Sequence, residues 1–152
     1  LDATDSGIVQ RFVIASIFIN MYGQSWKKNI DWLSGASECS WYGIKCRMFG
    51  TNRITEILLQ NNDIKGRLPE EIGALRFLEK IVLGQNKISG TIPPSFGQLA
   101  NLAHVELWGN YLNGHIPLSI GNMTSLSHLY LDGNAISGVI PSQIGNLANL
   151  ED

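Results

Sequence analysis

The sequence predicts an α/β solenoid in which one short strand per repeat stacks into a parallel sheet behind a helical N-terminal cap. Three observations lead to this fold class. A phrase of 24 residues recurs four times in the last two-thirds of the chain. Aliphatic, Asn, Gly and Pro residues hold fixed positions within the phrase, and the first third of the chain lacks it. Periods of about 20 to 50 residues are typical of solenoids, because one repeat cannot bury its own apolar edge.

Length and charge exclude several classes of function. The 152 residues suffice for one domain with a core. Charged residues make up 16% of the chain, and between Ile88 and Leu150 the only formal charges are Glu106 and Asp132. A net charge of −2 and the lack of Lys or Arg after Lys87 disfavour nucleic acid and anionic membrane surfaces as partners, since both require a basic footprint.

The first element that the sequence predicts is a helix over residues 5–21. Apolar residues recur there at helical spacing, at Ile8, Phe12, Ala15 and Ile19. The apolar run 12–19 is too short to span a membrane, which takes about 20 residues, and it lacks the flanks of a secretory signal. Because the chain begins with Leu1 rather than Met, we expect a removed leader or a fragment.

Two cysteines follow in the stretch "CSWYGIKC", at Cys39 and Cys46. A metal site would need further Cys or His ligands nearby, so a disulfide that closes this short loop is the better interpretation. A disulfide indicates an oxidising compartment. The sequence "NMT" makes Asn122 a candidate glycosylation site, which points the same way. We therefore expect an extracellular or secreted protein, or the outward-facing part of a membrane-anchored one.

The repeats align when they start at Ile54, Leu78, Leu102 and Leu126, with a fifth begun at Leu150. Within each repeat, aliphatic residues alternate with variable ones, which predicts a strand with one buried face. Asn then fills one column and Pro another, and Gly fills two. Asn satisfies backbone groups where the chain turns, and Gly and Pro shape an irregular or 3-10 return on the convex side. The Asn column is Asn62, Asn86, Asn110 and Asn134.

From 54 to 152 the chain resembles the leucine-rich repeat in its 24-residue form, "LxxLxLxxNxLxGxIPxxLGxL", found in plant receptor-like and defence proteins. The stretch 24–46 resembles the cap that precedes such repeats, where a helix, paired Trp residues and a disulfide seal the first coil. Here Ser40 lies between Cys39 and Trp41, and Ile44 stands where Val is usual in that pattern. The resemblance implies a cap over 1–52 and repeats over 53–152, and it makes Trp26, Trp32 and Trp41 core residues.

No second cap is visible after the fourth repeat. We therefore expect the natural protein to continue past Asp152 or to be sealed by another element.

Function is expected at the variable strand positions, which stack into columns on the concave sheet. The columns of the third and fourth repeats bring together two aromatic residues, two histidines and two acids. Surfaces of this composition are typical of recognition sites. The predicted ligand-binding residues are His104, Glu106, Trp108, His128, Tyr130 and Asp132.

The resemblance implies a non-enzymatic recognition module, like a receptor ectodomain, that binds a protein, peptide or polysaccharide ligand. An alternative is a secreted scaffold similar to a polygalacturonase inhibitor or associated with the cell wall. Catalysis and metal binding are disfavoured, because an open, shallow sheet neither excludes water nor fixes a substrate. No cofactor is predicted, since the chain lacks a phosphate loop, a nucleophile motif and a zinc-binding helix motif.

Overall fold

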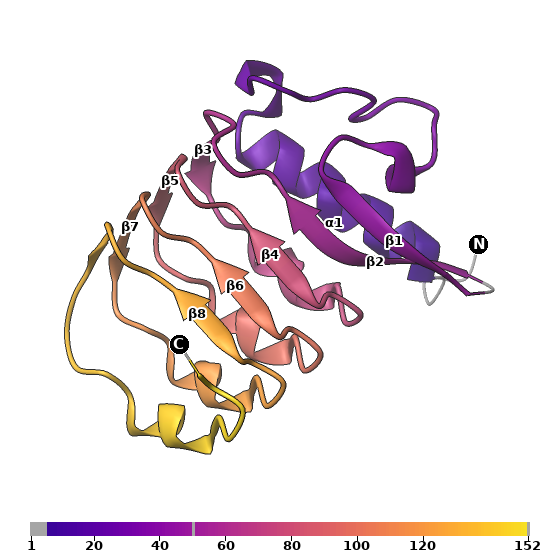
Figure 1. Ribbon diagram of the computed structural model, residues 1–152. Helices are drawn as coiled ribbons and strands as arrows, with labels where there is room; N and C mark the ends of the chain where they lie inside the picture. The colour runs from indigo at the N-terminus through magenta and orange to yellow at the C-terminus, as the bar shows by residue number, and fades with distance from the viewer. Residues whose placement is uncertain (1–5, 50, 152) are drawn as a thin grey trace.

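The computed structural model describes residues 6–49 and 51–151. The chain coils into a curved stack with a helix at its N-terminal end (Figure 1). One α-helix, nine strands and six 3-10 turns are described there, and all but the first strand pair run parallel to their neighbours. The helix and strands are α1 (Ser6–Asn20), β1 (Ile44–Phe49), β2 (Thr51–Leu58), β3 (Lys65–Arg67), β4 (Lys80–Val82), β5 (Lys87–Gly90), β6 (His104–Glu106), β7 (Tyr111–Gly114), β8 (His128–Tyr130) and β9 (Ala135–Ile136).

The concave sheet has the order β1-β2-β4-β6-β8, with one short strand from each repeat. Residues that pair across neighbouring strands are 24 positions apart in the sequence. Lys80 pairs with His104, and His104 pairs with His128. The predicted columns of variable residues are therefore rows of direct neighbours across the sheet. Strand β2 pairs with β4 on one side and, antiparallel, with β1 on the other. It spans residue 52, and the division into a cap over 1–52 and repeats over 53–152 stays a prediction.

The convex side of each coil is built from a second strand and a 3-10 turn. The turns are η3 (Glu70–Ala74), η4 (Pro94–Gln98), η5 (Leu118–Asn122) and η6 (Ser142–Asn146), as the Gly and Pro columns predict. A residue of the Pro column directly precedes each of these turns, and its backbone is extended. The second sheet, β3-β5-β7-β9, was not predicted from the sequence.

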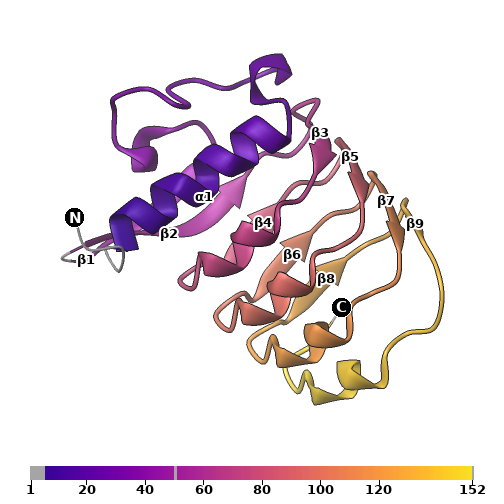
Figure 2. The ribbon, with the colours of Figure 1, turned by 180° about the vertical axis from the view of Figure 1, so that it is seen from behind.

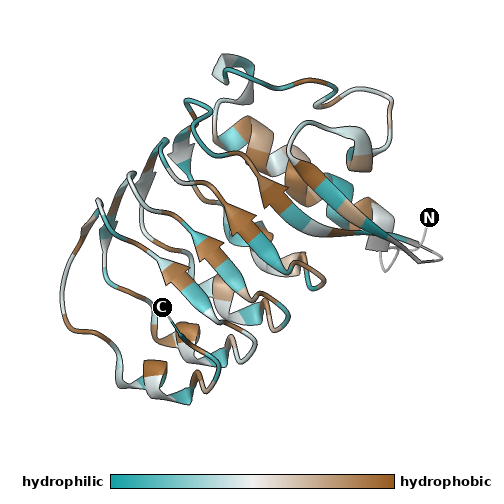
Figure 3. Cartoon of the chain, viewed as in Figure 1, coloured by the Kyte–Doolittle hydropathy of each residue, from teal (hydrophilic) through white to brown (hydrophobic). Residues whose placement is uncertain are grey.

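The core runs along the stack between these two sheets. Its residues are the inward aliphatic columns, such as Ile57, Ile81 and Val105, each 1% exposed or less. In Figure 3 the strands of the concave sheet carry apolar and polar residues in turn. Burial weakens in the last coil, since Ile140 is 74% exposed although Ile92, in the same column two repeats earlier, is 3% exposed.

A ladder of buried asparagines links consecutive coils. Asn86 accepts hydrogen bonds from the backbone N–H groups of Asn62 and Ile64, at 2.9 and 3.0 Å. Its side-chain amide donates to the carbonyls of Leu59 and Leu83, both at 2.9 Å. Asn residues at the same position of the next two coils make the same kind of bonds. These bonds satisfy backbone groups that would otherwise be buried without a partner.

The first coil is sealed by the cap. Phe18, Trp26, Trp32 and Trp41 form an aromatic cluster with ring centroids 4.9 to 5.6 Å apart. All four rings are buried, as predicted for the Trp residues. The predicted disulfide is confirmed, with a Cys39–Cys46 bond of 2.05 Å.

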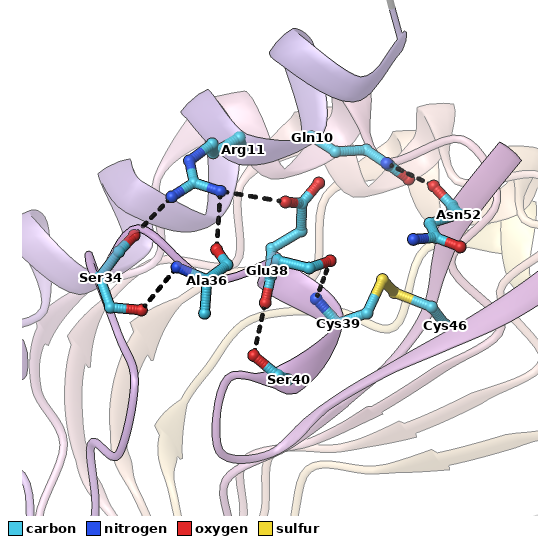
Figure 4. Close-up of polar contacts among 10 residues, drawn as sticks. Gln10, Arg11, Ser34, Ala36, Glu38, Cys39, Ser40, Cys46 and Asn52 are labelled. Carbon is cyan, nitrogen blue, oxygen red and sulfur yellow. Dashed lines mark hydrogen bonds and ion pairs between the residues drawn. A yellow bond between two sulfur atoms is a disulfide. The ribbon is translucent and has the colours of Figure 1, made fainter.

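Polar contacts fasten α1 to the rest of the cap (Figure 4). Gln10, itself buried, donates to the carbonyl of Asn52 at 2.9 Å and accepts from the backbone N–H of Ile54 at 2.8 Å. Arg11 donates to the carbonyls of Ser34 and Ala36 and pairs with Glu38. The Gln10 bonds tie the helix to β2, and the Arg11 bonds tie it to the segment 34–38.

The predicted helix is confirmed as α1, but its buried face is not the apolar stripe that the sequence made most visible. The residues packed into the core are Val13, Ile14, Ile17 and Phe18. Ile8, Phe12 and Ile19 are 43%, 61% and 68% exposed. The helix is apolar on both sides, so periodicity alone does not decide which side faces the stack. No helix within 6–49 or 51–151 has the length and apolarity needed to cross a bilayer.

Candidate functional site: an aromatic and histidine patch on the concave sheet

The structure brings five of the six predicted site residues into one connected group on β6 and β8. His104 and Glu106 lie on β6, and His128 and Tyr130 lie opposite them on β8. Trp108 follows β6 on the same side of the chain. We call these five residues the concave patch: His104, Glu106, Trp108, His128 and Tyr130.

Glu106 is the polar centre of the concave patch. Its Oε1 lies 2.7 Å from Nε2 of His104, and its Oε2 accepts a hydrogen bond of 3.3 Å from Nε1 of Trp108. Burial raises the pKa of Glu106, but the hydrogen bonds from His104 and Trp108, with the charge of Lys80, outweigh it, so the pKa is lowered. The carboxylate therefore holds an imidazole and an indole in place.

The rings of the concave patch touch across the two strands. The His104 and His128 rings are 5.1 Å apart, and Tyr130 lies 5.8 Å from His104 and 6.1 Å from His128. The hydroxyl of Ser127 lies 2.8 Å from Nδ1 of His128 and donates to the carbonyl of Ala103 at 2.9 Å. This contact orients His128.

Trp108 lies against a glycine of the preceding coil. A Cβ atom added to Gly84 would come within 2.7 Å of the Trp108 Nε1 atom. Any larger residue at 84 would therefore move the indole. Sequence reasoning missed both Gly84 and Ser127. The glycine could have been noticed, since it replaces a larger residue in a variable column.

The two aromatic side chains of the concave patch are only partly accessible. Trp108 and Tyr130 are half-buried, because the neighbouring coils and the ring contacts cover part of each side chain. Asp132 is exposed at the end of its row. Among the residues that the structure describes, no group of three or more His, Cys, Asp or Glu side chains is arranged to hold a metal ion.

The lowered pKa of Glu106 predicts a pH dependence of stability. The unfolded chain binds a proton at this carboxyl at higher pH than the folded chain, so protonation favours unfolding. The stability that Glu106 contributes is complete above the ordinary pKa range of glutamate and is lost as the pH falls through its lowered pKa. Urea midpoints measured across this range should fall more steeply for the wild type than for Glu106→Gln. Equal slopes for the two proteins would contradict the prediction.

The repeats match a family model. The model described as Leucine Rich Repeat matches residues 77–99, 101–123 and 125–147, which are consecutive coils of the stack. A search of curated proteins finds no match.

Solved structures match nearly the whole chain. The ectodomain of the receptor kinase SOBIR1 from Arabidopsis thaliana is 23% identical, with a TM-score of 0.79 over 100% of this chain and 79% of that one. A chain of the BIR3–SERK2 complex from the same plant is 31% identical, with a TM-score of 0.73 over 88% and 76%. The GASSHO1/SCHENGEN3 ectodomain of that plant, in complex with CASPARIAN STRIP INTEGRITY FACTOR 2, is 27% identical, with a TM-score of 0.89 over 93% of this chain and 17% of its own.

The first of these likenesses shows the fold, and the second is close enough in sequence to show kinship as well. The chain therefore belongs to the leucine-rich repeat family, in the form found in plant receptor ectodomains.

Proposed function

We propose that the chain is a non-enzymatic recognition module that binds a protein, peptide or saccharide ligand on its concave sheet. The observation that carries the proposal is the concave patch. It gathers an indole, a phenol and two imidazoles around one carboxylate, on two adjacent strands. Asp132, at the exposed end of its row, adds a second acid to this surface.

The geometry suits binding better than chemistry. Glu106 bonds to His104 and Trp108, and Ser127 contacts His128, so these side chains are ordered before a ligand arrives. Preorganised aromatic side chains lose little conformational entropy on binding, which favours affinity. The patch lies on an open sheet, which offers no enclosed space to exclude water from a reaction.

The relatives support the same class of role. The GASSHO1/SCHENGEN3 ectodomain is in complex with CASPARIAN STRIP INTEGRITY FACTOR 2, and BIR3 with SERK2. Both structures contain a chain with the fold of this protein, and neither identifies the ligand of this chain. We propose a receptor-ectodomain-like role on the combined ground of the fold and the concave patch.

The test is an affinity capture from extracellular fluid, read by mass spectrometry, followed by a binding measurement on the captured ligand. Buried aromatic anchors are each worth about 2 kcal/mol or more, or roughly 30-fold in affinity. A Trp108→Ala, Tyr130→Ala double variant is therefore expected to lose a ligand that the wild type retains. Near-ultraviolet circular dichroism should establish beforehand that the variant is folded.

The matched control is Tyr111→Ala, which removes an aromatic side chain that is 61% exposed on β7, away from the concave sheet. It should bind as the wild type does. Gly84→Ala should weaken binding without removing any contact group, because it displaces the indole of Trp108. A ligand that survives in the double variant, or is lost equally in Tyr111→Ala, would exclude the concave patch as the binding site.

We also propose that the protein works outside the cell and carries a glycan. The disulfide is typical of an oxidising compartment. Asn122 is exposed in η5, on the convex side, where a sugar would leave the concave sheet free.

The glycan has a direct test. Protein secreted from a eukaryotic host should lose mass on treatment with an N-glycosidase, and Asn122→Gln should lack that mass from the start. Thr124→Ala removes the acceptor motif while keeping the asparagine, so it should behave like Asn122→Gln. An unchanged mass in the wild type would contradict the prediction.

A further inference from the structure

The outer side of α1 is an apolar surface that the described part of the chain leaves uncovered. Ile8, Phe12 and Ile19 are 43%, 61% and 68% exposed, although the opposite side of the same helix is buried in the core. In Figure 2 the helix lies in front of β2 with its outer side toward the viewer. Exposed large side chains scattered singly are ordinary, but several in one row mark an interaction surface.

The row has the spacing of a helix-pairing seam. Ile8, Phe12, Ala15 and Ile19 follow one another at intervals of four, three and four residues. That is the spacing of the inward positions in a pair of packed helices. We call these four residues the α1 seam.

The seam continues past the end of the helix. Tyr22 is 64% exposed, on a left-handed backbone with φ of 54°, a conformation that costs energy for a residue other than glycine. Beside it, Ile19, Tyr22 and Leu33 help to line a surface pocket of about 420 Å³. Leu33 also has a left-handed backbone, with φ of 58°. Two large apolar side chains are thus held at the surface on strained backbone.

Charge limits what can cover the seam. Arg11 is the only charged residue of α1, and its guanidinium is bound to Glu38 and to the carbonyls of Ser34 and Ala36 (Figure 4). The α1 seam therefore offers no charge to an acidic or basic partner. An anionic membrane surface is disfavoured for the same reason, since such binding relies on Lys and Arg beside the apolar residues.

We propose that the α1 seam binds the α1 seam of a second copy of this chain, with the two helices antiparallel. A two-fold axis between Phe12 and Ala15 places each Phe12 opposite the Ala15 of the other copy, so that large packs against small. The same axis places Ile8 opposite Ile19, next to the pocket lined by Tyr22 and Leu33. No like charges meet, because the seam has none.

The area available predicts a weak dimer. The exposed side chains of Ile8, Phe12, Ile19 and Tyr22 together offer roughly 400 to 500 Å² per copy. A standard-size interface takes about 800 Å² from each partner, so contacts around the seam must add to it. We therefore expect association in the micromolar range or weaker.

The arrangement leaves the concave patch free. The helix lies behind the concave sheet in Figure 1 and in front of it in Figure 2, so the α1 seam and the concave patch are on opposite faces of the molecule. Two copies joined through α1 would present two ligand-binding surfaces. The inference does not depend on the proposed function, because it concerns a different surface.

The first test is sedimentation equilibrium of the full 152-residue chain over a range from low micromolar to submillimolar concentration. The wild type should shift from monomer to dimer as concentration rises. The variant Phe12→Ser, Ile19→Ser should associate at least roughly tenfold more weakly. The control Leu118→Ser removes an apolar side chain that is 66% exposed in η5, and it should associate like the wild type. A wild type that stays monomeric throughout, or a control that weakens association equally, would overturn the proposal.

The second test addresses the antiparallel register. Ile8→Lys alone and Ile19→Glu alone should each abolish the dimer, because each buries an unpaired charge. The double variant Ile8→Lys, Ile19→Glu should regain association at low salt, since each lysine then faces a glutamate of the other copy. If the double variant is no better than either single one, the proposed pairing is wrong. The residues substituted in the two tests are all exposed, so circular dichroism should report an unchanged fold in every variant. They are Ile8, Phe12, Ile19 and Leu118.

Discussion

Replacing Asn86 by alanine is expected to destabilise the folded chain by roughly 3 to 5 kcal/mol, as measured by urea unfolding. The side chain of Asn86 accepts hydrogen bonds from two backbone N–H groups of the preceding coil. It donates to two carbonyls, that of Leu59 in the preceding coil and that of Leu83 in its own. Alanine leaves these groups buried without partners, at about 1 to 3 kcal/mol for each group that water cannot reach. Such a loss is a large fraction of the stability of a domain of this size.

The matched control is Asn134→Ala in the last coil. Asn134 accepts from one backbone N–H group, that of Leu112, and is only half-buried. Water can replace part of its hydrogen bonding, so we expect a loss of roughly 1 to 2 kcal/mol. Equal losses of unfolding free energy at the two positions would mean that burial does not determine how much each asparagine stabilises the fold.

Replacing Trp32 by alanine is expected to cost roughly 3 to 5 kcal/mol, the usual range for deleting a buried aromatic ring. Trp32 is at the centre of the cap cluster, with Phe18, Trp26 and Trp41 rings 4.9 to 5.6 Å away. Its indole N–H also donates to the carbonyl of Tyr42 at 2.9 Å. The loss should appear first as faster hydrogen exchange in α1, because the cluster holds the helix against the first coil.

Trp32→Phe separates the two contributions of this side chain. It keeps a ring in the cluster but removes the hydrogen bond to Tyr42, so we expect a smaller loss of about 1 to 2 kcal/mol. If hydrogen exchange in Trp32→Ala rises equally in α1 and in the repeats, the cap does not unfold as a separate unit. If it rises in neither, the cluster is not needed to hold α1.

Both predictions bear on the proposed binding surface. The concave patch is ordered only if β6 and β8 stay in register, and the asparagine ladder fixes the coils that carry them. Variants of the ladder should therefore weaken ligand binding indirectly, through the fold. Trp108→Ala and Tyr130→Ala remove contacts instead, and they should change affinity with a smaller change in the urea midpoint than the ladder variants cause. A measurement of both quantities tells the two effects apart.

Much of the architecture could be predicted from the sequence because it is periodic. Four aligned repeats place Lys80, His104 and His128 in one row, and the strand register agrees. The Asn column predicted side chains that serve buried backbone groups, and the hydrogen bonds of Asn86 confirm it. The short spacing of Cys39 and Cys46 predicted their disulfide. A repeat contacts only its neighbours, so local pattern determines most of its surroundings.

The remaining features depend on contacts between coils, and these are not periodic. Trp108 is half-buried because Gly84, one coil earlier, leaves room for its indole. The outward side of α1 could not be chosen from its spacing, because both sides of the helix are apolar and only packing against β2 and the aromatic cluster selects one. The sequence by itself determined the coil, its period, its inward columns and the rows of the concave sheet. Tertiary structure decided how far each side chain in those rows is covered, since coverage depends on the volume of residues a full repeat away.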